Sequence, residues 1–330
     1  MRLRLALFAA VAVAFPGIAH AQGAQASSPP EFARRIDQLK PGQWVWAPQV
    51  APNGPVLIYV DLSRQIAMVY RNGVRIAATT VSTGKAGHAT PTGVFTILQK
   101  DAKHRSSKYN NAPMPYQQRL TWDGVALHAG GLPGYPESHG CVHLPYGFAR
   151  ELFALTDLGV TVVVQGDAQN HVRTSENSLL APFNDKGQPV ERQALAEGEE
   201  YRWTPELAGA GPLSIIISKS DQRVVVIRNG TEIGRSVARI DDSDPGSHVI
   251  TLIEQAGRPQ WVYVGLPGHD EDAGHVLDEA TINRVHMPRP FYEAVKAQLK
   301  PGSTILVTNS AVGAKPLERL TIMDAVVPRP

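Results

Sequence analysis

Two stretches of the chain share one strand pattern. The segment from Pro55 to Gly73 aligns without a gap with the segment from Pro212 to Gly230, and both end in Arg-Asn-Gly. Each holds two runs of aliphatic and β-branched residues joined by a polar turn, which is typical of paired strands. Asn-Gly after the second run favours a tight hairpin turn. The chain must therefore accommodate two similar β units.

Further matches follow in the same order. Gly131-Leu-Pro-Gly134 recurs as Gly265-Leu-Pro-Gly268, and Val142-His-Leu-Pro145 recurs as Val285-His-Met-Pro288. Two copies are too few for a solenoid, so we predict two similar domains side by side. In this register Val262 stands where the first copy has His128, and Arg284 stands where it has Cys141. The second copy is therefore expected to be degenerate.

The first copy predicts a mostly β unit. We expect strands over residues 56–60, 65–70, 76–81, 93–98 and 160–165, with short helices over 31–40 and 148–155. With 330 residues, of which 43% are hydrophobic and 19% charged, the chain can build one large or two medium cores.

The first 21 residues have the order of a secretory signal peptide. A charged start at Arg2 and Arg4 precedes an apolar run and the small-residue end Ala19-His20-Ala21. We expect cleavage after Ala21, export to the periplasm and no stable membrane anchor, because the apolar run is too short to remain as a span. Without Arg2 and Arg4 the formal charge of +2 falls to zero, which argues against nucleic acid as a partner.

The chain has a single cysteine, Cys141, in the run Ser138-His139-Gly140-Cys141-Val142-His143. A lone cysteine cannot form an internal disulfide, and at an ordinary pKa only a few per cent of a thiol is ionised near pH 7. A nucleophilic role therefore needs a nearby base, for which His128, His139 and His143 are all candidates that spacing cannot separate.

Acyl transfer also needs donors for an oxyanion. We expect the amides of Gly140 and Cys141 to supply them. Ser138 is expected either to orient a histidine or to cap the turn.

His128 followed by Ser138-His-Gly-Cys141 resembles the YkuD-type L,D-transpeptidase catalytic domain, over roughly Pro55 to Gly166 and including Thr90-Pro-Thr-Gly-Val-Phe95. The resemblance implies that Cys141 is the nucleophile and His128 its base, oriented by the carbonyl of Ala129. It implies that His139 either supports the residues that contact the substrate or handles protons. His143 departs from the Asn or Arg usual at its position, which bears on substrate contact or loop support. The loop from His128 to Cys141 is also short, which suggests a less covered site.

The resemblance further implies the substrate, a peptidoglycan stem peptide. The thiolate would attack the third residue of a tetrapeptide, release D-alanine and hold a thioester that an amine resolves. The acceptor would be a second stem, an envelope protein or a D-amino acid, and water would make the enzyme a carboxypeptidase. Carbapenems would acylate Cys141. Substrate-side candidates are Tyr109, Asn110, Asn111, Met114 and His143, and no cofactor or metal is expected.

Two other interpretations stay open. The cysteine and its three histidines are also zinc-ligand types, although no recognised zinc spacing is present. A non-catalytic wall-binding or scaffold protein is the other alternative. The second half is expected to have a structural packing role, to shape the first domain's substrate cleft, or to bind glycan or a protein partner.

Two further segments have predicted roles. Trp44 and Trp46 are expected to pack the leader onto the domain. Asp270-Glu271-Asp272 is expected to form a solvated acidic loop, with a calcium site as the alternative.

The fold class predicted is mainly β: a YkuD-type sandwich of mixed sheets with short helices, followed by a degenerate domain of similar fold. The expected division is a signal peptide (1–21), a flexible leader with a short helix (22–50), the catalytic domain (51–167), a linker (168–205), the degenerate domain (206–311) and a tail (312–330).

Overall fold

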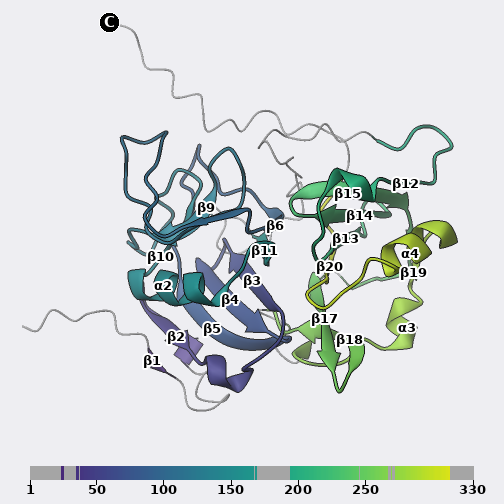
Figure 1. Cartoon of the computed structure of the whole chain (residues 1–330), viewed down its shortest axis with the longest axis horizontal. Helices are drawn as coiled ribbons and strands as arrows, with labels where there is room; N and C mark the ends of the chain where they lie inside the picture. Colours follow the sequence, from purple (N-terminus) through teal and green to yellow (C-terminus); the bar gives the residue numbers. More distant parts are fainter. Residues whose placement is uncertain are drawn as a thin grey trace, which may run out of the picture.

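The computed structural model describes residues 24–25, 35–36, 38–166, 168, 194–244, 246–266, 269 and 272–312. They form a mainly β protein with few short helices, as the sequence predicts, in two halves that lie side by side (Figure 1). The expected signal peptide, most of the linker and most of the tail lie outside the described residues. So does half of the expected helix over 31–40.

The first half is built on a seven-stranded sheet of order β1-β2-β5-β4-β3-β11-β6. Its strands are β1 (Ala24–Gln25), β2 (Trp44–Trp46), β3 (Val56–Asp61), β4 (Ile66–Arg71), β5 (Val74–Thr80), β6 (Gly93–Thr96) and β11 (Thr161–Gln165). The β4–β5 hairpin turns at Asn72 and Gly73, which have φ values of +54° and +77°. Both central residues are thus left-handed, which explains the Asn-Gly pair.

The expected leader differs from the structure at its end. β2 pairs with β5, and the short 3-10 helix η1 (Pro48–Val50) follows it, so residues 44–50 belong to the folded domain. Trp44 and Trp46 stack edge-on against Phe148, with ring centroids 5.9 and 5.4 Å away. Aromatic burial therefore fixes this segment on the domain.

A second sheet, of order β10-β9-β8-β7, lies over one face of the first. It contains β7 (Gln99–Asp101), β8 (Gln117–Arg119), β9 (Ala126–Ala129) and β10 (Val142–Leu144), and the helix α2 (Tyr146–Leu155) follows β10. Leu127, Leu144 and Phe148 are buried with Ile58 and Val69 of the large sheet. This core fixes the position of β9 and β10.

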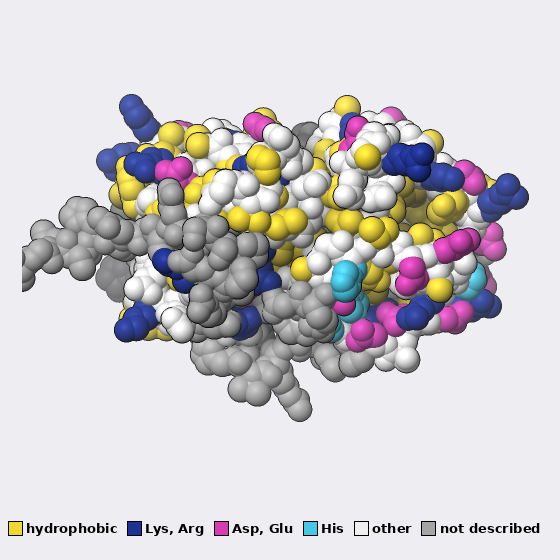
Figure 2. Space-filling view, turned by 90° about the horizontal axis from the view of Figure 1, so that it is seen from below, with side chains coloured by type: hydrophobic (Ala, Val, Ile, Leu, Met, Phe, Trp, Pro, Cys, Tyr) yellow, Lys and Arg dark blue, Asp and Glu magenta, His cyan; other side chains and the backbone are white. Residues whose placement is uncertain are grey.

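The second half has its own seven-stranded sheet, of order β12-β15-β14-β13-β20-β17-β18. Its strands are β12 (Tyr201–Trp203), β13 (Ser214–Ser218), β14 (Arg223–Arg228), β15 (Thr231–Val237), β17 (His248–Gln255), β18 (Arg258–Val264) and β20 (Thr304–Thr308). From β12 to β17 the order corresponds strand for strand to β2-β5-β4-β3-β11-β6. Histidine and acidic side chains lie on the surface of this half (Figure 2).

The halves differ where the small sheet would be. Among its described residues, the second half has only the strand pair β16 (Arg239–Ile240) and β19 (Val285–His286) there. The 3-10 helix η2 (Pro205–Leu207) and the helices α3 (Glu279–Ile282) and α4 (Arg289–Lys296) also belong to this half. β18 continues the large sheet instead of forming a second layer. Val262 therefore corresponds to His128 in the sequence alignment but not in its position in the fold.

The two large sheets share a core. Leu57, Met68 and Tyr70 of the first sheet are buried in one cluster with Ile216 and Leu306 of the second. The Tyr70 hydroxyl donates to the carbonyl of Gly265 at 2.7 Å. Each half thus covers an apolar sheet face of the other.

Candidate active site

The strands β9 and β10 place the cysteine beside a histidine. They pair in parallel, with Val142 opposite Leu127 and His143 opposite His128. Val142 and Leu127 point into the core, so alternation directs His128, His143 and Cys141 to the other face. Of the three histidines that spacing left open, His128 and His143 are on the same sheet face as Cys141.

His128 is held in one orientation by its neighbour. Its Nδ1 lies 2.8 Å from the carbonyl oxygen of Ala129. Since a carbonyl can only accept, Nδ1 carries the proton and Nε2 keeps its lone pair. Burial, and then the charge of His143, lower the pKa of His128 to about 4. The imidazole is therefore neutral near pH 7 and able to accept a proton at Nε2.

Cys141 is half-buried in front of β10. Its thiol donates to the carbonyl of Gly124 at 3.5 Å. Burial raises the pKa of Cys141 to about 11, although the backbone N–H of Ala126 partly offsets the effect. Thiol and imidazole are thus both neutral in the free protein, and a thiolate must form when a base takes the proton.

Ser138 caps the turn in front of the cysteine. Its hydroxyl donates to the Cys141 carbonyl at 2.6 Å and accepts from the Gly140 N–H at 3.1 Å. Gly140 has φ of +105°, a conformation that side chains disfavour, which explains the glycine. The Gly140 amide expected in the oxyanion hole is therefore bonded to Ser138 in this structure.

His143 packs between His128 and the preceding loop. Its ring centroid lies 4.8 Å from that of His128, and its Nδ1 is 3.2 Å from the Gly131 carbonyl and 3.7 Å from Glu137 Oε1. A Cβ on Gly130 would lie 2.6 Å from this ring. His143 therefore supports the loop that joins His128 to Cys141.

His139 lies in a different aromatic group. Its ring centroid is 4.7 Å from that of His88 and 4.8 Å from that of Tyr109. Burial, and then the Cys141 thiolate where it forms, raise the pKa of Tyr109. The Tyr109 hydroxyl is buried without a hydrogen-bond partner among the described residues. His139, two residues before Cys141, thus packs against the rings of His88 and Tyr109.

The other substrate-side candidates differ in how exposed they are. Asn110 and Asn111 are exposed in a loop, with φ values of +42° and +55°. Met114 is only 8% exposed. Its backbone N–H donates to His104, so Met114 holds the loop from inside.

Sequence reasoning missed the segment that carries the cysteine turn. The carbonyl of Thr83 accepts from the amides of Glu137 and Ser138, both at 3.0 Å. A Cβ on Gly84 would lie 2.0 Å from the carbonyl oxygen of His88. Thr83-Gly84 directly after a predicted strand is the signal that could have drawn attention to this support. Nothing in the sequence pattern pointed to Gly124.

The zinc interpretation gains no support from the arrangement of these side chains. Among the described residues, Cys141 and its neighbouring histidines do not bring three donor atoms within reach of one ion.

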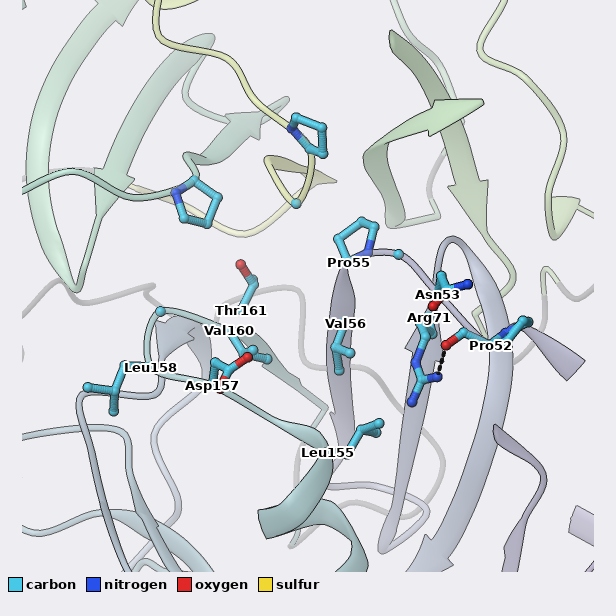
Figure 3. A pocket seen from close by; sticks show the side chains of 15 residues that line it. Pro52, Asn53, Pro55, Val56, Arg71, Leu155, Asp157, Leu158, Val160 and Thr161 are labelled. Carbon is cyan, nitrogen blue, oxygen red and sulfur yellow. Dashed lines mark hydrogen bonds between the residues drawn. The ribbon is translucent and has the colours of Figure 1, made fainter. Parts of the chain in front are cut away.

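A separate cleft of about 470 Å³ lies where the two halves meet, lined by Pro55, Leu158 and Pro212 among others (Figure 3). Neither Cys141 nor His128 lines this cleft, so it is separate from the cysteine site.

Comparison with known proteins identifies the first half. Residues 55–164 match the family model YkuD, described as the L,D-transpeptidase catalytic domain. No curated protein sequence matches the chain. The matched range contains His128, Ala129 and the whole run from Ser138 to His143.

Several solved structures are similar to the chain. An L,D-transpeptidase (Yku) from Stackebrandtia nassauensis has 31% identity over 43% of this chain and 68% of its own, with a TM-score of 0.33. L,D-transpeptidases from Mycobacterium smegmatis and Mycobacterium tuberculosis H37Rv each have 24% identity over 34% of this chain, with TM-scores of 0.32 and 0.33. The match spans 60% and 58% of those two chains. Through its first half, the chain belongs to the YkuD family of L,D-transpeptidase catalytic domains.

Proposed function

We propose that the protein is a peptidoglycan L,D-transpeptidase with Cys141 as nucleophile and His128 as general base. One observation carries the proposal: Cys141, the only cysteine, lies on the same face of the small sheet as His128. His128 is neutral, and its Nδ1 is held by the Ala129 carbonyl. That bond leaves Nε2 as the atom that accepts a proton.

The first half-reaction forms a thioester. His128 Nε2 takes the thiol proton, and the Cys141 sulfur attacks the carbonyl of the third residue in a tetrapeptide stem. The backbone amides of Gly140 and Cys141 hold the oxyanion. For this the Gly140 N–H exchanges its bond to Ser138 Oγ for one to the substrate. Collapse breaks the amide bond, and the leaving amine of D-alanine takes the proton from the imidazolium.

The second half-reaction transfers the acyl group to an amine. The acceptor is a second stem in a 3→3 cross-link, an envelope-protein lysine or a free D-amino acid. His128 then removes a proton from the attacking amine and returns it to the departing sulfur. His139, Tyr109, Asn110 and Asn111 form the substrate side, and His143 supports the base.

We place this activity in the periplasm, with residues 1–21 as the export signal cleaved after Ala21. The basis is the charged, apolar and small-residue order of that segment. Within the part of the chain that the structure describes, no helix has the length and apolarity to cross a membrane.

We infer that the second half is a degenerate copy of the first that serves as its support. The corresponding strand orders of the two large sheets favour duplication. At the position of Cys141 it has Arg284, and its described residues form no counterpart of the four-stranded sheet that carries His128. Its apolar sheet face buries that of the first half, which favours packing over a substrate role.

Intact-protein mass spectrometry tests the activity. Wild type and Cys141→Ala are incubated with a disaccharide-tetrapeptide and, separately, with a carbapenem. We expect an adduct on wild type alone, with D-alanine released from the tetrapeptide. A folded wild type that forms no adduct and releases no D-alanine would reject the enzyme in favour of a wall-binding protein.

A further inference from the structure

A histidine and acid cluster lies in the second half, away from the cysteine. In the antiparallel pair β17–β18, Val249 is opposite Val264. His248 at the start of β17 is therefore at the same end of the sheet as the segment that follows β18. That segment carries His269 and Asp272, and Asp244 lies four residues before His248.

Three side chains of this cluster converge. One donor atom each from His248, His269 and Asp272 lies within 4.8 Å of the others. Asp272 Oδ2 is 3.5 Å from His248 Nδ1 and 3.8 Å from His269 Nδ1. The two imidazole centroids are 4.8 Å apart. All three side chains are half-buried, so solvent ions can reach them.

These separations suit a bound cation better than direct hydrogen bonds. Hydrogen bonds between nitrogen and oxygen span roughly 2.7 to 3.2 Å, which is shorter than both distances to Asp272. Ligands around a tetrahedral zinc ion, with bonds of about 2.0 to 2.1 Å, are about 3.4 Å apart. The His248–Asp272 distance is close to that value, and a small shift of His269 would complete the set.

Asp244 provides an independent sign of metal chemistry. Its Oδ2 lies 2.8 Å from Nε2 of His248, the ring nitrogen that faces away from Asp272. Metal-binding histidines commonly donate their other N–H to a carboxylate, which orients the ring. Asp244 is therefore placed to orient His248 in this way.

The surrounding loop is built around His269. A Cβ on Gly246 would lie 2.7 Å from its Nε2, so only glycine admits the ring in this place. Lys219 Nζ donates to the Gly246 carbonyl at 2.8 Å and lies 3.5 Å from Asp242. These bonds hold Asp242 and Gly246 in place on either side of Asp244 in the sequence.

We propose that His248, His269 and Asp272 bind a divalent transition-metal ion of the zinc class, with Asp244 orienting His248. Two imidazoles and one carboxylate are ligands that zinc favours, and they leave a fourth position for water. The ion joins the start of β17 to the segment after β18.

Isothermal titration of the metal-stripped full chain with Zn²⁺ tests the site. The Cys141→Ala background removes the thiol as a competing ligand. We expect one equivalent of Zn²⁺ to bind and the melting temperature to rise. His269→Ala should weaken binding at least 100-fold, and Asp244→Asn about 10-fold because an orienting carboxylate contributes 10- to 100-fold.

His275→Ala is the matched control, because His275 is exposed in the same segment and outside the cluster. It should bind Zn²⁺ like the background protein. His269→Asn, checked for folding by circular dichroism, guards against a loss caused by unfolding. Absence of binding in the background protein would overturn the proposal. So would binding that persists in folded His269 variants but disappears with His128→Gln.

Discussion

At the scale of single residues, the reactive pair is kept uncharged by burial. The pKa of Cys141 is raised to about 11 and that of His128 is lowered to about 4. A preformed pair of thiolate and imidazolium would need the pKa of Cys141 to lie below that of His128. In the proposed mechanism the thiolate is therefore a transient species, formed as His128 takes the proton during attack.

The rate at which iodoacetamide alkylates Cys141 should reflect the raised pKa of its thiol. The rate should rise about tenfold per pH unit from pH 7 to 10, since only the thiolate reacts and its fraction grows up to a pKa of about 11. Mass spectrometry of the adduct against time gives the rate. A rate that levels off below pH 8 would contradict a neutral pair and indicate a preformed thiolate.

The buried neutral His128 should also make stability depend on pH. Its pKa is near 6.5 in an unfolded chain and about 4 in the folded one, so the unfolded state binds the extra proton between these values. Stability is therefore complete above pH 6.5 and lost as the pH falls, by about 2 kcal/mol between pH 7 and pH 5.

Urea unfolding at pH 7 and pH 5 measures this loss. His128→Gln lacks the titrating ring and should lose about 2 kcal/mol less than wild type over the interval. His139 and His143, whose pKa values are also lowered by burial, remain in both proteins and cancel in the comparison. Equal losses in the two proteins would show that His128 does not carry the effect.

At the scale of elements, the turn before β10 depends on one hydroxyl. Ser138 is 3% exposed and satisfies both the Cys141 carbonyl and the Gly140 N–H. Ser138→Ala leaves these groups without that partner, at a cost of about 1 to 3 kcal/mol. We also expect turnover to fall 10- to 100-fold because the amide expected at the oxyanion moves.

Thermal unfolding and D-alanine release measure the two effects. Ser107→Ala is the matched control, because Ser107 is exposed in the neighbouring loop. It should change neither quantity. Full turnover in Ser138→Ala would separate the turn from catalysis.

The sequence predicts five of the seven strands in the large sheet of the first half, and the run that carries Cys141. Strand alternation and the Asn72-Gly73 turn suffice for the β3–β4–β5 hairpins, since these contacts are local. The role of β2 and the pairing of β9 with β10 depend on contacts between distant segments, which periodicity does not encode. For the same reason the Thr83 contacts and the place of His139 beside Tyr109 emerge only from the fold.

At the scale of the whole molecule, the two halves are joined by polar contacts as well as by apolar packing. The Tyr70 hydroxyl reaches Gly265 of the second half, and Gly73 lies so close to Val262 that a Cβ would come within 2.7 Å of its Cγ2. Contacts of this kind require a fixed arrangement of the two sheets. The stability of one half should therefore depend on the other.

Tyr70→Phe should reveal this coupling. It removes a buried hydrogen bond between the halves and should lower the free energy of unfolding by about 1 to 2 kcal/mol. Tyr59→Phe is the matched control, since its hydroxyl makes a 3.4 Å contact with Gln165 inside the first half. Urea denaturation measures both, and a larger loss in Tyr59→Phe would argue against coupling through Tyr70.

Removal of residues 206–330 should destabilise the catalytic half although it leaves every site residue in place. The deletion exposes the sheet face of Leu57, Tyr59 and Met68, which the second half now buries. Each large apolar side chain returned to water costs about 1.5 to 3 kcal/mol, so three of them approach the whole stability of a small domain. We expect the truncated protein to aggregate or to bind a hydrophobic dye, with a lower melting temperature. A truncated protein that stays monomeric, melts like the full chain and keeps its turnover would show that the second half is not needed as a support.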